Sequence, residues 1–117
     1  MSFDSVLQTI LTSCKDARGV SLMGIDGIPI AEVGRDGFDL NLVGVEFGRF
    51  LPELQKAADA ASGGAVEELI VRASNLWVLL RPVDEDIFLL TVLDGDANFG
   101  KARFEMRRHL LALREEL

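Results

Sequence analysis

The fold is decided by residues 20–33, which read Val20-Ser-Leu-Met-Gly-Ile-Asp-Gly-Ile-Pro-Ile-Ala-Glu-Val33. Two apolar stretches, Val20–Ile25 and Ile28–Val33, flank the dipeptide Asp26-Gly27. Asp-Gly between strand-forming residues is a strong hairpin signal, because both residues accept the backbone angles of a tight turn. Pro29 cannot donate a hydrogen bond to a neighbouring strand. We therefore expect the second strand at a sheet edge, with Pro29 facing outward.

A helix is predicted before the hairpin. Its apolar residues recur at helical spacing, and they are Phe3, Val6, Leu7, Ile10, Leu11 and Cys14. Ser2 is placed to cap the first turn, and Asp4 suits the positive end of the helix dipole. We predict that this helix runs to about Ala17 and that Gly19 stops it.

A second helix is predicted after the hairpin. Gly34–Asn41 is rich in turn-forming residues and is predicted to be a surface loop. The helix then runs from about Leu42 to Ala61, where Ser-Gly-Gly ends it. Pro52 lies inside it, and an interior proline removes a backbone hydrogen bond and crowds the preceding turn. We expect Pro52 to kink this helix or divide it into two pieces.

Three strands and a final helix complete the predicted order. The strands are Val66–Ala73, Leu76–Val83 and Ile87–Leu93, and their short links require antiparallel neighbours. The last helix has an apolar stripe at spacings of three and four residues, formed by Phe99, Ala102, Met106, Leu110, Leu113 and Leu117. The sequence therefore predicts an α+β fold of the order α-ββ-α-βββ-α.

Composition limits the classes of function. The chain has 117 residues, 49% hydrophobic and 26% charged, which is typical of one packed domain over residues 1–117. A net charge of -7 argues against binding to nucleic acid or to an anionic membrane. The start lacks the pattern of a signal peptide, and no apolar run has the length of a membrane span. We expect a soluble cytoplasmic protein, and the single Cys14 excludes an intrachain disulfide.

No catalytic constellation emerges from the sequence. His109 is the only histidine, so any Cys-His or Ser-His pair must include it. Cys14 lies on the apolar stripe of the first helix, where a buried, inert thiol is the simpler interpretation. We place His109 at a helix surface or boundary and predict no catalytic residue.

One segment resembles a calcium loop in part. Asp94, Asp96, Asn98 and Glu105 occupy positions one, three, five and twelve of an EF-hand loop. However, Phe99 stands where the glycine should be, and a strand rather than a helix precedes the segment. Capping of the last helix is the simpler role for these side chains. We therefore expect no metal at this segment. The glycines form neither a dinucleotide fingerprint nor a P-loop, so we also expect no nucleotide, and we predict no other cofactor.

The second helix carries a face of small and medium residues. Gly44 and Gly48 lie one turn apart and share this face with Leu51, Gln55 and Ala58. Glycine inside a helix costs about 1 kcal/mol relative to alanine, so two of them suggest a close contact. That contact is either with a helix of another chain or with the protein's own sheet.

An open sheet edge is predicted on the side away from Pro29. It falls to Val66–Ala73, which contains no proline and has Leu69, Ile70 and Val71 at its centre. Such an edge invites pairing with another chain. The candidate dimer interface comprises Gly44, Gly48, Leu51, Gln55, Leu69, Ile70 and Val71.

Two motifs and the element order resemble a known family. Asp26-Gly-Ile-Pro-Ile30 and Asn98-Phe-Gly-Lys-Ala-Arg103 are similar to segments of the Roadblock family of dynein light chains. The single-domain, MglB-like members that regulate bacterial cell polarity are the most similar. The resemblance implies a five-stranded sheet with one helix on one face and two on the other. It also implies a homodimer or heterodimer formed through the first meander strand and the second helix.

The resemblance further implies a non-enzymatic partner of a small Ras-like GTPase, as activator, scaffold or exchange-factor component. No arginine is identified as an arginine finger, and Arg49 and Arg72 are interpreted as surface residues. Two alternatives remain open. One is a sensory domain with an apolar ligand pocket between helix and sheet, and the other is a motor-complex adaptor without a GTPase partner.

Overall fold

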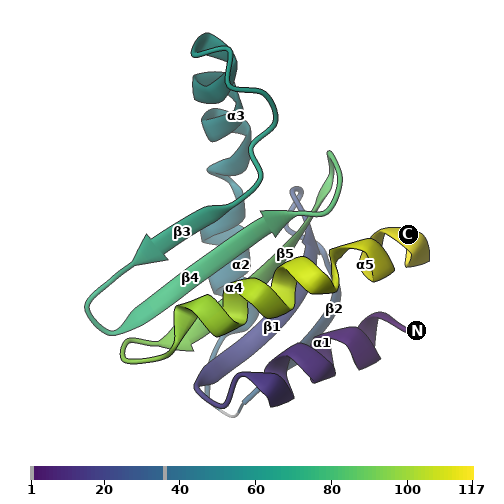
Figure 1. Cartoon of the computed structure of the whole chain (residues 1–117), viewed down its shortest axis with the longest axis vertical. Coiled ribbons are helices and arrows are strands. Elements are labelled where there is room, and N and C mark those ends of the chain that lie inside the picture. Colours follow the sequence, from purple (N-terminus) through teal and green to yellow (C-terminus); the bar gives the residue numbers. More distant parts are fainter. Residues whose placement is uncertain (1, 36) are drawn as a thin grey trace.

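The computed structural model describes residues 2–35 and 37–117, so Met1 and Asp36 of the predicted loop lie outside the described residues. Its elements are α1 (Phe3–Ser13), β1 (Ala17–Gly24), β2 (Pro29–Gly34), α2 (Leu40–Gly48), α3 (Leu51–Ala60), β3 (Leu69–Arg72), β4 (Leu76–Pro82), β5 (Ile87–Asp94), α4 (Phe99–Arg108) and α5 (Leu110–Glu116). The strands form one antiparallel sheet in the order β2-β1-β5-β4-β3. Helices α1, α4 and α5 cover one face and α2 covers the other (Figure 1). The predicted fold class is confirmed.

The predicted hairpin is confirmed. Gly27 has a φ of 89°, a left-handed backbone angle that favours glycine. The N–H of Gly24 donates to the carbonyl of Ile28 at 2.9 Å, and the N–H of Ile28 donates to Oδ1 of Asp26 at 3.1 Å. Pro29 is exposed on β2, which is an edge strand as expected.

The first helix begins as predicted but ends earlier. Ser2 accepts a hydrogen bond from the N–H of Ser5 at 3.2 Å, which confirms the cap. The predicted extension to Ala17 and the predicted stop at Gly19 are wrong. The helix α1 ends at Ser13, Ala17 opens β1 opposite Leu93, and Gly19 lies within β1. Ala17 is buried in β1, and a buried alanine is equally compatible with the inner face of a helix, so this residue does not mark where the helix ends.

The two long predicted helices are each divided. Pro52 lies in the first turn of α3, where its missing N–H is tolerated, and α3 leads away from the sheet (Figure 1). The final helix is interrupted at His109, between α4 and α5. The predicted position of His109 is a helix surface or boundary. The residue is only 7% exposed, so the surface position is wrong, and it lies at the boundary between the two helices.

The strand at the far edge is shorter than predicted. β3 spans four residues rather than Val66–Ala73. Gln55 and Glu68 account for the difference, because their side chains hold the preceding segment in other contacts. The N–H of Val66 donates to Oε1 of Gln55 at 2.9 Å, and Glu68 is paired with two arginines.

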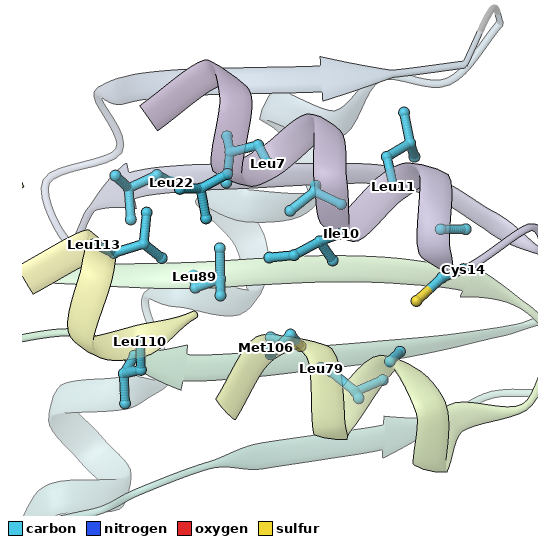
Figure 2. Packing of buried hydrophobic residues seen from close by; sticks show 14 of the residues in the cluster. Leu7, Ile10, Leu11, Cys14, Leu22, Leu79, Leu89, Met106, Leu110 and Leu113 are labelled. Carbon is cyan, nitrogen blue, oxygen red and sulfur yellow. The ribbon is translucent and has the colours of Figure 1, made fainter. Parts of the chain in front are cut away.

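Two apolar layers fill the space on either side of the sheet. The larger layer packs α1, α4 and α5 against the strands, with Leu7, Ile10, Leu89, Met106 and Leu113 at its centre (Figure 2). The smaller layer lies under α2 and includes Met23, Leu40, Phe88 and Leu90. Within the described part of the chain, no helix has both the length and the apolar character needed to cross a bilayer.

Two glycines set how closely α2 approaches the sheet. A Cβ added at Gly48 would lie 2.5 Å from Cζ of Phe88, and one added at Gly44 would lie 2.6 Å from Cε of Met23. Both distances are too short for carbon atoms that are not bonded. The two obstacles differ, because a buried phenyl ring is rigid whereas the end of a methionine side chain can move.

Gly48→Ala should therefore lower the free energy of unfolding by about 1–3 kcal/mol through overpacking. In Gly44→Ala, the gain in helix propensity of about 1 kcal/mol offsets a smaller clash, so its stability should stay close to that of the wild type. Urea unfolding of the two variants measures the difference. Equal stability of both variants would contradict this account of the α2 contact.

Candidate interaction site at the β3 edge

The β3 edge is free among the described residues. β3 pairs with β4, from Leu69 opposite Leu80 to Arg72 opposite Trp77, and no other described strand adjoins its outer side. Its side chains alternate between the two faces. Leu69 and Val71 pack on the layer beneath α2, whereas Ile70 is 37% exposed. The edge therefore offers an outer row of backbone donors and acceptors flanked by apolar side chains.

Helix α3 projects away from the sheet on the side of this edge and has little contact with the sheet (Figure 1). Beyond Leu51, which is buried, its residues are exposed or half-buried. Gln55 connects the helix to the segment that enters β3. Its Nε2 donates to the carbonyl of Gly64 at 3.0 Å and to Asp59 at 2.9 Å, while its Oε1 accepts from Val66.

The structure separates the predicted interface residues into two groups. Gly44, Gly48 and Leu51 face the protein's own sheet. Of the two contacts considered for the small-residue face, a helix of another chain or the protein's own sheet, these three residues make the contact with the sheet. The other group consists of Gln55 on α3 and of Leu69, Ile70 and Val71 on β3. A single chain does not test whether either group contacts a partner, so the interface remains a prediction.

An ion-pair cluster anchors the entry to β3 against α4, and sequence reasoning missed it. Glu68 accepts hydrogen bonds from Nε of Arg103 at 2.9 Å and from Nη1 of Arg81 at 3.3 Å. The hydrogen bond from Arg103 is the main reason why the pKa of Glu68 lies below its usual value. No local pattern indicates this cluster, because its members come from three separate segments.

Stacked side chains close one end of the sheet. The guanidinium of Arg72 lies 4.6 Å from the centre of the Trp77 ring, which stacks on Phe99 at 4.4 Å. Arg72 Nη1 and Trp77 Nε1 both donate to the carbonyl of Gly95. Arg72 is exposed, as predicted for a surface residue, but it is held in place. Arg49 is also exposed and pairs with Glu46 at 3.4 Å.

The partial calcium loop has structural uses. Asn98 accepts a hydrogen bond from the N–H of Lys101 at 3.2 Å, which confirms the predicted cap of α4. Asp94 pairs with Nε of Arg18 at 2.6 Å. Within residues 2–35 and 37–117, no group of three or more histidine, cysteine or acidic side chains is arranged to hold a metal ion.

Cys14 and His109 occupy buried positions in the larger layer. Burial raises the pKa of the Cys14 thiol, and the nearby Glu105 carboxylate raises it further, which disfavours the reactive thiolate. His109 Nδ1 lies 2.8 Å from the backbone oxygen of Glu105. Because this oxygen can only accept, Nδ1 carries the proton of that bond. The predicted buried thiol is confirmed.

Two hollows among residues 2–35 and 37–117 do not suit an apolar ligand. A pocket between α4, β3 and β4 has a volume of about 10 Å³, close to the minimum for one water molecule. A second hollow, at Arg18, Asn75 and Asp94, is wide open and mostly polar. Neither has the shape expected of the sensory-domain alternative.

The chain resembles several solved structures over nearly its whole length. It is 34% identical to MglC from Myxococcus xanthus, with 100% of both chains covered and a TM-score of 0.72. A Roadblock/LC7 domain from Streptomyces avermitilis has 14% identity, coverage of 98% and 97%, and a TM-score of 0.86. The gliding protein MglB from Thermus thermophilus has 19% identity, coverage of 96% and 85%, and a TM-score of 0.84. No family model and no curated protein matches the sequence.

The Glu68 cluster should stabilise the fold in a pH-dependent way. Because the pKa of Glu68 is lowered by folding, its contribution is present above the unfolded pKa of about 4.3 and is lost as the pH falls through the folded value. Glu68→Gln should therefore reduce the free energy of unfolding at pH 7, by about 1 kcal/mol or less for a partly exposed pair. The difference from wild type should shrink below about pH 4.5.

Urea unfolding between pH 3.5 and pH 7 measures this difference. Glu67→Gln is the matched control, because Glu67 is 79% exposed and lies 3.9 Å from Arg81. A difference between wild type and Glu68→Gln that does not change with pH would contradict the role assigned to the carboxylate.

Proposed function

Because the chain belongs to the Roadblock/LC7 family, in the branch of MglB and MglC, we propose that it is a non-enzymatic, dimeric regulator or scaffold of a small Ras-like GTPase. The observation that carries this proposal is the free, proline-free β3 edge, on whose side α3 projects from the sheet. The proposal treats residues 1–117 as one Roadblock-like domain of a cytoplasmic protein.

The dimer would form by pairing β3 with β3 of a second copy. An antiparallel pair of identical edges obeys two-fold symmetry and continues the sheet from one protomer into the other. Ile70 lies in the middle of β3 and contributes exposed apolar surface there. In such an arrangement, Gln55 and the outer face of α3 lie next to the partner. The apolar rows of Leu69 and Val71 would meet their equivalents across the symmetry axis.

The GTPase would be regulated by contact rather than by an inserted arginine. Arg72 is held by Trp77 and the carbonyl of Gly95, and Arg49 pairs on its own helix. An arginine finger must instead extend into the nucleotide site of its partner. We infer that any stimulation of hydrolysis comes from ordering the GTPase's own switch residues.

The direct test uses the small Ras-like GTPases of the source organism, purified and loaded with GDP or a non-hydrolysable GTP analogue. Binding is measured by calorimetry, and hydrolysis of GTP is measured with and without this protein. We expect one GTPase to bind with a preference for one nucleotide state. Absence of binding in both states would overturn the GTPase proposal, and a dimer without such binding would favour the motor-adaptor alternative.

Ile70→Lys should convert the dimer to a monomer. A lysine in the middle of an edge strand places two like charges across the symmetry axis and opposes pairing. Sedimentation velocity at micromolar concentration measures the change. Ile30→Lys is the matched control, because Ile30 is similarly exposed on the opposite edge strand. A dimer that survives Ile70→Lys, or a wild type that is monomeric, would contradict the proposed interface.

Arg49→Ala and Arg72→Ala should each retain the effect on GTP hydrolysis to within about threefold, because neither residue acts as a finger. Loss of a true arginine finger lowers the rate by about 10³-fold or more. The measurement is single-turnover GTP hydrolysis with the bound GTPase in excess. A loss of that size in either variant would assign the finger to that residue.

A further inference from the structure

Exposed apolar side chains gather where the β1–β2 hairpin meets α2. This hairpin–α2 patch consists of Ile25, Ile28, Ile30, Leu42 and Val45. Ile28 is 64% exposed and Leu42 is 56% exposed. The hairpin and the helix are in contact, because a Cβ added at Gly27 would lie 3.4 Å from Cγ2 of Val45. Single exposed apolar residues are common on protein surfaces, whereas five large ones on adjacent elements indicate an interaction surface.

The patch is not required to pack the core. α2 already buries its other side, which carries Leu40, Gly44 and Gly48, against β1 and β5. Leu42 and Val45 lie three residues apart on the outer side, so α2 is apolar on two sides. A helix that is apolar on both sides is usually covered on both. The outer side of α2 is therefore suited to being covered by another molecule, because no described part of this chain covers it.

The surroundings of the patch are acidic. Residues 24–33, 41–48 and 84–86 contain six carboxylates and no lysine or arginine, and the carboxylates are Asp26, Glu32, Glu46, Asp84, Glu85 and Asp86. The β4–β5 turn belongs to this surface, because the N–H of Ile25 donates to the carbonyl of Asp86 at 2.8 Å (Figure 1). The basic side chains nearest to these segments in the chain are engaged elsewhere or locally. Arg35 donates to the carbonyl of Ala17 at 2.6 Å, Arg49 pairs with Glu46, and Arg81 pairs with Glu68. Arg114 donates to the carbonyl of Val83 at 2.8 Å, beside the β4–β5 turn.

The backbone at this edge favours a helical occupant over an added strand. Pro29 has no N–H to offer, and the pairing of β1 with β2 is irregular between Leu22 and Met23. A continuous ladder along β2 is therefore interrupted. A helix satisfies its own backbone and needs only apolar and charged contacts from the surface.

We propose that the hairpin–α2 patch binds a basic amphipathic helix of a partner protein. The apolar side of that helix covers the isoleucines and Leu42, and its lysines and arginines face the carboxylates of the two turns. The site lies at the β2 edge, opposite the β3 edge of the sheet. Pairing through β3 leaves it open, so the site does not depend on the proposed dimer or on a GTPase.

The test is a titration of the ¹⁵N-labelled full chain followed by NMR. The probe is a synthetic helix of about 18 residues, five turns long, with leucine on one face and lysine on the other. We expect shifts centred on residues 25–30, 42–45 and 84–86, and affinity that falls as salt is added. The matched probe with glutamate in place of lysine should bind at least about tenfold more weakly.

Two variants separate the apolar and charged contributions. Ile28→Ser should weaken binding of the lysine probe about tenfold, whereas the control Leu111→Ser, 65% exposed on α5, should leave it unchanged. Asp86→Lys should weaken binding of the lysine probe and strengthen binding of the glutamate probe. Both changed side chains are exposed, and the NMR spectra report whether each variant is folded.

Several results would overturn the proposal. They are absence of saturable binding of the lysine probe, equal binding of the glutamate probe, shifts centred on α4 and α5, and unchanged affinity of folded Ile28→Ser. Each can occur whether or not the protein dimerises, so failure here is distinguishable from failure of the proposed function.

Discussion

The arrangement of the molecule depends on the pairing of β1 with β5. This pairing joins an early hairpin to a late meander, with Gly19 opposite Val92 and Met23 opposite Phe88. It places α1 on the same face as α4 and brings the turn that begins at Ile25 next to the turn that ends at Asp86. It also leaves β2 and β3 as the outer strands. Bringing together segments this distant in sequence costs chain entropy. Burial of the apolar layers on both faces of the central strands offsets that cost.

The two edges of the sheet differ in chemistry. β2 carries Pro29 and adjoins an acidic, apolar surface, whereas β3 has an unobstructed backbone and follows the loop from the protruding α3. An edge blocked by proline is protected from indiscriminate strand pairing, and only the other edge is suited to it. The protein therefore presents two surfaces of different kinds on opposite sides, one suited to backbone pairing and one suited to side-chain contact.

Local chemistry explains which features could be predicted from the sequence. The hairpin at Asp26-Gly27, the caps at Ser2 and Asn98 and the break at Pro52 each depend on a few adjacent residues, and all were predicted. The end of α1, the length of β3 and the burial of His109 depend on residues that are distant in sequence. The direction in which Gly44 and Gly48 face could not be decided, because a small residue suits a neighbouring helix and a neighbouring sheet equally well. The Glu68 cluster has no sequence signal, since its arginines lie on β4 and α4.

The side chain of Gln55 links α3 to the loop that leads into β3. Its amide donates to the carbonyl of Gly64 and accepts from the N–H of Val66, as a neighbouring strand would do. The tilt of α3 and the position of the chain entering β3 are therefore mechanically coupled. A change in the tilt of α3 relative to the sheet would therefore break these hydrogen bonds or move the segment that leads into β3.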